Sequence, residues 1–583
     1  MRKCLFVLSL LALGLFFGTP AVAFAQENND TDADQQVKVY IPFIFIPGQP
    51  GSEVVDETAV DKSVVRIYLN DARQLHELAH DLDLFEEPTT NGYAVALASA
   101  EEVAALRAQG VRVESDAVRT SELRSAQAEV LARSGEATNA IPGYACYRTV
   151  EETYTTFANL ATSRPTLATW TDIGNSWEKV IPGGKAGYDV YALKLTNSAK
   201  PGPKPKFLLM SAIHAREYAT AELATRFVED LVNKYNNNDP DATWLLDNFE
   251  LHVIPQANPD GRKMAEAGQL WRKNTDSDDG CRRSTTWGTD LNRNSSFKWN
   301  TGGSSSNACN ETYRGPGAAS EPETQAIESY ARSIFADQRG PLDTDAAPVT
   351  AEGLFITLHS YGQLVLYPWG WTTSPAPNST QLQTLGRKFG FFTGYQVCNG
   401  PACLYATSGT TDDMVYGERG IASYTFEIGT AFFQSCTTFT SDILPKNLPA
   451  LTYAFKAARR PYQSPSGPEA LSLTVSPASV PAGTSITVNA TLNDTRYNSN
   501  GWGTEPSQTI QSGRYTIDTP SWTSGVTTYP LSAVDGSFNA SIENVRATIN
   551  TSGLSAGRHT IFVEGQDANG NWGVPTAIFI TIN

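Results

Sequence analysis

Short apolar runs alternate with longer amphipathic runs between residues 143 and 461, and this alternation restricts the possible folds more than any other feature. Phe207–Ile213 is almost entirely apolar, and a helical pattern over Ala219–Tyr235 follows it. A repeated strand-then-helix pattern is typical of an α/β domain built on one buried sheet. Further candidates for buried strands are Leu251–Pro255, Leu354–Leu358 and Ala422–Phe426.

The 583 residues exceed what one hydrophobic core can hold, so we expect further folding units around this α/β domain. Residues 63–135 alternate strand and helix patterns, which predicts a small α+β unit, and residues 26–62 have the composition of a linker. The Pro/Ser-rich stretch Arg460–Pro468 marks a boundary. Beyond it, residues 469–583 contain short Thr-, Val- and Ile-rich runs separated by turn residues, which predicts an all-β, immunoglobulin-like sandwich.

The first 25 residues have the three parts of a secretory signal peptide. Arg2 and Lys3 form a basic start, and Cys4–Phe17 is an apolar core. Ala23–Ala25 (Ala-Phe-Ala) has the small-x-small pattern of a signal-peptide cleavage site. No apolar run is long enough to span a membrane, so we expect a secreted, extracellular protein without a membrane span. Six cysteines lie outside the signal, and this even number predicts disulfides whose pairing stays open.

The ionisable residues indicate a metal site and argue against a nucleic-acid interface. A net charge of −17 does not suit a partner that needs a basic face. His214 directly follows the first apolar run, with Glu217 three residues later, while His359 and Glu427 each follow another buried-strand candidate. Ligands bind at the carboxyl ends of the strands in α/β sheets, so these side chains should meet. Two imidazoles and one carboxylate are protein ligands of a catalytic zinc.

The order of the motifs in this chain resembles that of the zinc carboxypeptidase family, the family of the digestive carboxypeptidases A and B. The similarity extends from about Tyr147 to Tyr453. A lone His-x-x-Glu would be a weak signal, whereas the ordered set is a strong one. The motifs are His214-Ala215-Arg216-Glu217, Asn258-Pro259-Asp260-Gly261, Trp271-Arg272-Lys273-Asn274, Asp290-Leu291-Asn292-Arg293-Asn294, His359-Ser360-Tyr361 and Tyr424-Thr425-Phe426-Glu427.

This resemblance implies the catalytic roles of five residues. His214, Glu217 and His359 would hold zinc as the cofactor. Glu427 would be the general base that takes a proton from the attacking water. Arg272 would stabilise the oxyanion, a role typically worth about 3–4 kcal/mol.

The resemblance also implies how the substrate is held. Asn292 and Arg293 would bind the terminal carboxylate of a peptide, the latter through its bidentate guanidinium. Tyr405 stands where the family has its mobile capping tyrosine, and Arg216 would add positive charge beside the site. Asp290 would orient a ligand histidine without being a metal ligand itself.

Asp412 is the residue on which the predicted specificity depends. In register with the family it falls at the base of the pocket for the C-terminal side chain, where members that prefer Lys or Arg carry Asp and hydrophobic-preferring members carry an apolar residue. Gly370 and Gly400 fall at two other pocket positions and leave room for a long side chain. We therefore expect a preference for basic C-terminal residues. In the alternative, Asp412 is solvated or paired with Arg419, and the enzyme also accepts peptides with an apolar C-terminal residue.

Two structural expectations follow from the same resemblance. Residues 63–135 resemble the inhibitory prosegment of the family, and the alternative is a permanent N-terminal domain ahead of a catalytic domain at 136–461. Arg119, Arg124 and Arg133 are candidate activation sites. The family has a disulfide comparable to Cys281–Cys309, which predicts that pairing here.

Three other interpretations of the sequence compete with this one. His76-Glu77-Leu78-Ala79-His80 has the HExxH form of another class of zinc protease, although an apolar helix stripe explains it as an ordinary packing helix. A second alternative is a binding protein that has the same fold but no catalytic activity. The complete set of site residues disfavours this alternative. Tryptophans in the sandwich would allow carbohydrate or cell-surface contact if exposed, whereas core packing is the simpler explanation. They are Trp502, Trp522 and Trp572.

Overall fold

A computed structural model describes residues 62–583 except residues 90–91, 134–139, 182, 282–285 and 502. The predicted signal peptide and all but the last residue of the predicted linker lie outside the described residues. The described residues belong to one compact unit. Within them, no helix has both the length and the apolar character needed to cross a membrane.

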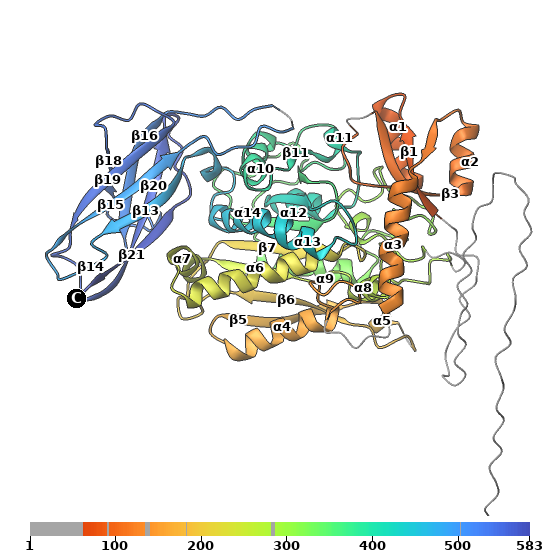
Figure 1. The fold of residues 1–583 in the computed structure, drawn as a ribbon, viewed down its shortest axis with the longest axis horizontal. Coiled ribbons are helices and arrows are strands. Elements are labelled where there is room, and N and C mark those ends of the chain that lie inside the picture. Colours follow the sequence, from red (N-terminus) through yellow and green to blue (C-terminus); the bar gives the residue numbers. More distant parts are fainter. Residues whose placement is uncertain (1–61, 90–91, 134–139, 182, 282–285, 502) are drawn as a thin grey trace, which may run out of the picture. The chain divides into compact units, whose positions relative to one another are not determined.

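One eight-stranded mixed sheet forms the centre of residues 143–461, the expected catalytic domain (Figure 1). Its strand order is β11-β10-β12-β9-β7-β8-β6-β5, and the four strands β12, β9, β7 and β8 run parallel to one another. All four are buried along most of their length, which explains why they have near-continuous apolar sequences. The bounds are β5 Ala168–Asn175, β6 Asp189–Leu195, β7 Lys206–Ser211, β8 Glu250–Ile254, β9 Leu354–His359, β10 Leu364–Tyr367, β11 Gln396–Asn399 and β12 Ala422–Glu427.

Helices cover both faces of this sheet. Phe207 and Leu209 of β7 pack into one core with helices α6, α7, α10 and α14, whereas Leu208 and Met210 pack into another with α9 and α12. This alternation is the two-residue period of a strand with both faces buried. The helices are α4 Val150–Ser163, α5 Trp177–Val180, α6 Tyr218–Asn236, α7 Pro240–Asn248, α8 Pro259–Glu266, α9 Pro322–Ile334, α10 Ser379–Thr393, α11 Gly400–Cys403, α12 Thr411–Arg419, α13 Cys436–Thr438 and α14 Leu444–Ala457.

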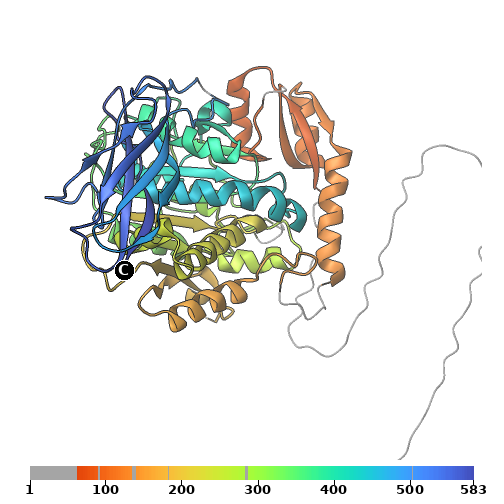
Figure 2. The same ribbon diagram turned by 60° about the vertical axis from the view of Figure 1, so that its left-hand side comes forward.

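Residues 62–133, here named the N-terminal subdomain, form the expected α+β unit (Figure 2). The sheet order is β2-β3-β1-β4, and all of its pairings are antiparallel. Its core is continuous with Leu364, Leu366 and Tyr405 of the catalytic domain, so the two parts share one apolar cluster. The elements are β1 Lys62–Tyr68, α1 Ala72–Asp81, β2 Asp83–Leu84, β3 Tyr93–Ser99, α2 Ala100–Ala108, β4 Val113–Ser115 and α3 Ala117–Arg133.

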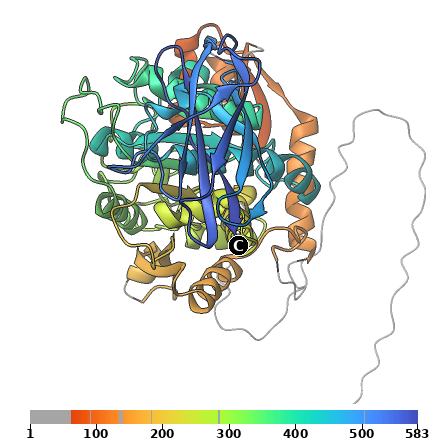
Figure 3. The ribbon, with the colours of Figure 1, turned by 90° about the vertical axis from the view of Figure 1, so that its left-hand side faces the viewer.

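Residues 469–582, here named the sandwich, form two β-sheets over a core of aliphatic side chains (Figure 3). Trp522 contacts the rings of Trp244 and Phe249 of the catalytic domain, and Trp572 stacks under the guanidinium of Arg514. Both tryptophans thus have packing partners; Trp502 lies outside the described residues. The strands are β13 Glu469–Ser476, β14 Ser479–Val480, β15 Ser485–Asn493, β16 Ile510–Ile517, β17 Tyr529–Pro530, β18 Ser532–Ala533, β19 Ile542–Asn550, β20 Gly557–Asp567 and β21 Thr576–Ile582.

Three disulfides use all six cysteines outside the predicted signal. Cys281–Cys309 confirms the pairing that the family resemblance predicts. Cys146–Cys436 joins residues 290 positions apart, and Cys398–Cys403 closes a short loop beside α11. The sequence left these two pairings open, because only the folded chain decides which cysteines come together.

Candidate active site

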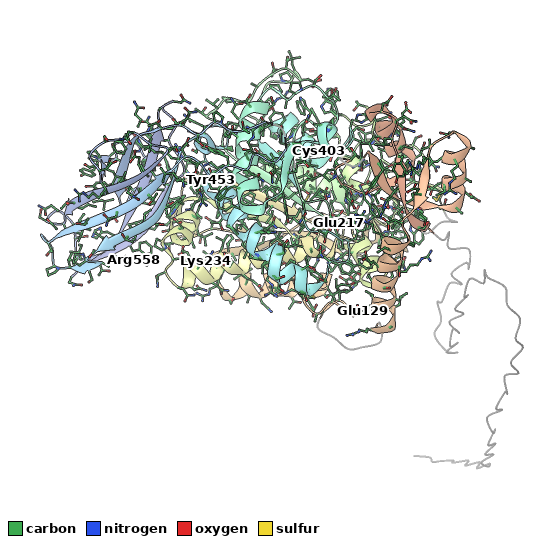
Figure 4. All side chains as sticks on the ribbon, turned by 45° about the horizontal axis from the view of Figure 1, so that its top comes forward. Glu129, Glu217, Lys234, Cys403, Tyr453 and Arg558 are labelled. Carbon is green, nitrogen blue, oxygen red and sulfur yellow. A yellow bond between two sulfur atoms is a disulfide. The ribbon has the colours of Figure 1, made fainter. Side chains whose placement is uncertain are left out.

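The parallel strands β7, β9 and β12 bring their carboxyl ends to one edge of the sheet. His359 and Glu427 are the last residues of β9 and β12, and they are direct partners in the strand register. His214 follows β7, and Glu217, labelled in Figure 4, is the residue before helix α6. The predicted convergence of these four side chains is therefore observed.

Three ligand atoms stand at the separations that a tetrahedral zinc site needs. His214 Nδ1 lies 2.8 Å from Glu217 Oε1 and 3.1 Å from His359 Nδ1. His359 Nδ1 lies 3.5 Å from Glu217 Oε2. Metal–ligand bonds of about 2.0–2.1 Å imply ligand separations of about 3.3 Å in a tetrahedron. The donor set and its spacing fit zinc.

The protonation states of the two histidines support a metal site. Burial lowers the pKa of His359 to about 4. Burial, together with the charge of Arg272, also lowers the pKa of His214. Both imidazoles are then neutral near pH 7, which is the form that binds a metal. Within the described part of the chain, the second metal-like group consists of three carboxylates without a histidine, Asp276, Asp279 and Glu321, a set that does not resemble a zinc site.

Asp290 links the metal site to Arg272. Its Oδ1 lies 3.2 Å from His214 Nε2, and its Oδ2 accepts a hydrogen bond of 3.1 Å from Arg272 Nε. Burial would raise the pKa of Asp290, but the charges of Arg272 and His214 outweigh burial and hold that pKa well below its usual range. The ionised carboxylate of Asp290 thus fixes the orientation of the imidazole.

Glu427 is a buried carboxylate with the character of a base. Burial raises its pKa well above its usual range, and the negative charges of Glu86 and Glu217 raise it further. A metal cation bound beside it would lower that pKa again. Oε2 of Glu427 is buried and has no hydrogen-bond partner within the described residues, so it is free to accept a proton.

Asn292, Arg293 and Tyr405 line one cavity with His214 and Glu427. Asn292 and Arg293 lie in the short 3-10 helix Leu291–Arg293 that follows Asp290. Asn292 Oδ1 accepts from Thr411 N at 3.1 Å, and Arg293 Nε donates to Gly303 O at 3.1 Å. These contacts leave polar atoms of both side chains for a ligand in the cavity.

Asp412 lines the same cavity, together with Gly370, Gly400 and Thr425. It is only 7% exposed and accepts a hydrogen bond of 3.2 Å from Thr425 Oγ1. No cation among the described residues, Arg419 included, forms an ion pair with Asp412. The two glycines lie close together, since a Cβ on Gly400 would be 3.7 Å from Gly370 Cα.

Local structure explains how the loops that carry these residues are held. Asn258 caps helix α8 and donates to Ile213 O and Lys273 O, which joins the loop before His214 to the loop after Arg272. The buried guanidinium of Arg262 donates to the carbonyl oxygens of Ala215 and Glu217 at 3.2 Å. Sequence reasoning missed Arg262, although its place directly after the Asn-Pro-Asp-Gly motif was a usable signal.

The histidines of the HExxH motif lie elsewhere. His76 Nδ1 accepts a hydrogen bond of 2.9 Å from Ala406 N, the residue after Tyr405. His80 Nδ1 contacts Ser304 O at 3.1 Å, and its Nε2 accepts from Gly303 N at 3.4 Å. Neither histidine belongs to a metal-like group within the described residues. Helix α1 is therefore a packing helix that faces the catalytic domain.

Two acidic residues that sequence reasoning missed face the site arginines. Asp83 forms a bidentate ion pair with Arg216, with distances of 2.6 and 2.7 Å. Glu86 Oε1 lies 3.4 Å from Arg272 Nη1. No local motif marks these carboxylates, because only the docking of the N-terminal subdomain brings them to the site.

Comparisons with known proteins agree with this fold and site. Residues 153–448, just over half of the chain, match the family described as "Zinc carboxypeptidase". The chain therefore belongs to the zinc carboxypeptidase family, whose cofactor is zinc.

Individual relatives are also named as carboxypeptidases. The "Metallocarboxypeptidase A-like protein" of Trichophyton verrucosum is 31% identical over 261 residues, which is 43% of this chain and 57% of that protein. "Carboxypeptidase A1" of Rattus norvegicus is 29% identical over 335 residues, 55% of this chain and 72% of that protein. The crystal structure of carboxypeptidase A from Helicoverpa armigera superposes with a TM-score of 0.55 at 22% identity, covering 69% of this chain and 97% of that one, and so shares the fold.

Proposed function

We propose that this chain is a secreted zinc metallocarboxypeptidase that hydrolyses the last peptide bond of peptides and proteins. The convergence of His214, Glu217 and His359, two of which line one cavity with Glu427, carries the proposal. Family membership supports the reaction class, and the paired cysteines suit an exported protein. In this assignment residues 1–25 are the signal peptide.

Two residues act directly on the scissile bond. Zinc, when bound, supplies a Lewis acid that polarises the carbonyl and lowers the pKa of water. Glu427 accepts the proton of the attacking water through its buried Oε2, which has no hydrogen-bond partner within the described residues. Arg272, held by Asp290, donates to the developing oxyanion, a role typically worth about 3–4 kcal/mol.

Replacing the base tests this assignment. Glu427→Gln keeps the shape of the side chain but cannot accept the proton, so kcat should fall by about two orders of magnitude or more. Zinc content and melting temperature should stay near those of the wild type, because Glu427 is outside the ligand set. A variant with near-normal kcat would show that another residue is the base.

The far end of the cavity selects the chain terminus. Asn292 and Arg293 bind the terminal carboxylate, and Tyr405 closes over it. The side chain of the last residue then extends toward Asp412. A buried carboxylate without a described cationic partner is costly, and a substrate guanidinium or ammonium would pair with it. We therefore assign a preference for Arg or Lys, while the carboxypeptidase A names of the relatives favour the alternative in which apolar ends are also accepted.

Blocked peptides that differ only in the last residue test this preference. Coupling of about 1.5–3 kcal/mol predicts a kcat/KM tens to a hundredfold higher for Arg than for a neutral residue. Asp412→Ile should reverse the order, and a zinc chelator should abolish all turnover. A wild type that prefers Phe tenfold or more would show that Asp412 does not set the specificity.

The N-terminal subdomain is assigned as an inhibitory prosegment of the catalytic domain 136–461. Its support is the contact of Asp83 and Glu86 with the site arginines. Activation then requires cleavage near Arg119, Arg124 or Arg133. All three lie on helix α3, and Arg133 is its last residue, directly before the undescribed residues 134–139.

A further inference from the structure

Arg262 is a buried cation that has no part in the proposed reaction. Its side chain is fully buried, and burial lowers the pKa of its guanidinium from the ordinary value. Within the described part of the chain no carboxylate forms an ion pair with it, and its hydrogen bonds go to backbone carbonyl oxygens. A buried charge is costly unless such contacts offset the loss of water. The carbonyl oxygens that Arg262 contacts therefore indicate what it stabilises.

These carbonyl oxygens belong to residues 214–218, here named the ligand loop, which contains two of the three candidate metal ligands. Arg262 Nη1 donates to Ala215 O and Glu217 O, and Nη2 donates to Tyr218 O, each at 3.2 Å. The guanidinium also lies against the ring of Tyr218, 4.9 Å from its centroid. One side chain thus bonds to three residues of the loop, one of which is itself a metal-ligand candidate.

The ligand loop is irregular, so its backbone depends on donors from other segments. Glu217 precedes the first residue of α6, and its φ and ψ of −87° and 76° are not helical. Ala215 lies outside the helix as well, and its N donates to Arg272 O at 3.1 Å. A buried carbonyl oxygen in such a segment is costly without a donor. Because Arg262 supplies donors to both residues, its loss would allow the loop to rearrange.

The Asn-Pro-Asp-Gly-Arg sequence explains how helix α8 reaches the ligand loop. Asn258 and Arg262 are four residues apart, so they lie on the same side of the helix. Asn258 Nδ2 donates to Ile213 O at 3.1 Å and to Lys273 O at 2.9 Å. Gly261 permits this close approach, because a Cβ there would lie 2.4 Å from Lys273 O. Helix α8 therefore holds the backbone just before the ligand loop through its cap and the loop itself through Arg262.

We propose that Arg262 is a positioning residue for the metal centre, which places the side chains of His214 and Glu217 by holding the carbonyl oxygens of the ligand loop. This inference rests on the proposed function, because it assumes that these two side chains and His359 hold zinc. Arg262 acts through the backbone and is not itself a ligand. Groups that orient metal ligands typically change metal affinity by about 10–100-fold.

The zinc affinity of the full-length chain tests the proposal, measured by competition with a chelator of known affinity. Arg262→Met removes the donors and keeps a long side chain, whereas Arg262→Lys keeps the charge without the guanidinium fork. The matched control is Arg148→Met. Arg148 also contacts helix α6, but through the carboxylates of Glu222 and Glu229 at 2.9 and 2.6 Å. Arg226 remains as a partner for Glu222 in this control.

The dissociation constant for zinc should rise about 10–100-fold in Arg262→Met and at least about threefold in Arg262→Lys, and stay within about twofold of the wild type in Arg148→Met. The increase in melting temperature that zinc produces should shrink in the same order, which separates weaker metal binding from a general loss of stability. Unchanged or tighter zinc binding in the Arg262 variants overturns the proposal, and so does an equal loss in Arg148→Met. Arg262→Lys decides alone if Arg262→Met does not fold. A wild type that binds no zinc would instead refute the metal centre of the proposed function.

Discussion

The N-terminal subdomain and the sandwich both pack against the catalytic domain through apolar as well as charged groups, but only the N-terminal subdomain reaches the candidate site residues. The N-terminal subdomain uses Asp83 and Glu86 on two site arginines and His76 on the backbone beside Tyr405. The sandwich uses aromatic rings, with Trp522 and Phe562 at 6.2 and 6.1 Å from Trp244. The first contact uses groups that a substrate also needs, whereas the second uses groups remote from the site.

This difference indicates which contact can be temporary. The N-terminal contact occupies arginines that the proposed reaction needs, so it has to be lost before they can act. Large aromatic surfaces lose their stabilisation when they are exposed to water. We therefore expect the sandwich to be a permanent part of the folded enzyme and the N-terminal subdomain to be removable.

The largest effect is expected at the sandwich contact. Trp244 is 2% exposed, so Trp244→Ala should lower the free energy of unfolding by about 3–5 kcal/mol. Denaturant unfolding should show this loss in the uncleaved chain and in the cleaved enzyme alike. Leu342→Ala, at a residue 62% exposed, is the control and should change stability by less than about 0.5 kcal/mol. A loss that appears only in the uncleaved chain would contradict a permanent sandwich.

A comparable effect, confined to the uncleaved chain, is expected at Asp83. Asp83→Asn leaves the guanidinium of Arg216 buried without its charged partner, which typically costs about 3–5 kcal/mol. The cleaved enzyme without its N-terminal subdomain should be unaffected, and the exposed Glu101→Gln serves as control. Unfolding of both forms, before and after cleavage, measures the difference. Equal stability of wild type and variant before cleavage would mean that the ion pair does not hold the subdomain.

A smaller effect is expected from acidification. Burial lowers the pKa of His76 below its ordinary 6.5, and the unprotonated Nδ1 accepts from Ala406 N. The released subdomain therefore binds more protons than the docked one, so docking is complete above pH 6.5 and weakens as the pH falls below that value. Retention of the cleaved subdomain in gel filtration at pH 7.5 and 5.5 measures this. His76→Asn keeps an acceptor and should show a weaker pH dependence; stronger retention at pH 5.5 would contradict the sign.

The smallest effect is expected at Lys388, a buried cation between the catalytic domain and the sandwich. Its Nζ lies 3.2 Å from Glu469, and Arg496 pairs with the same carboxylate at 3.2 Å. Lys388→Met keeps the side-chain volume while Glu469 keeps a partner, so stability should change by only about 1 kcal/mol in either direction. Thermal unfolding checks this. A loss as large as that at Trp244 would mean that the sandwich contact depends on charge.

The place where the candidate site residues meet could be predicted from the sequence, because local patterns specify the strand ends. The buried strands ending before His214 and at His359 and Glu427 were visible as apolar runs, and parallel strands place such ends at one edge. The Cys281–Cys309 pairing followed from family resemblance. β1 begins at Lys62, one residue before the predicted start of the N-terminal subdomain, and the predicted end at residue 135 lies outside the described residues.

Long-range partners could not be predicted in this way. Asp83 and Glu86 are 133 and 186 residues from the arginines they face, and no local pattern encodes such a distance. Likewise, the composition of the sandwich did not show that Trp522 would pack on Trp244.

The sequence by itself therefore determined the α/β class and the convergence of His214, His359 and Glu427 at its strand ends, because periodicity and strand ends are local properties, whereas the expected roles of the polar residues around them rest on the family resemblance. Only the tertiary structure decided which charges meet. It placed Asp83 on Arg216, His76 on Ala406 and Glu86 beside the metal site, since ion pairs and hydrogen bonds between distant segments depend on how the finished domains dock.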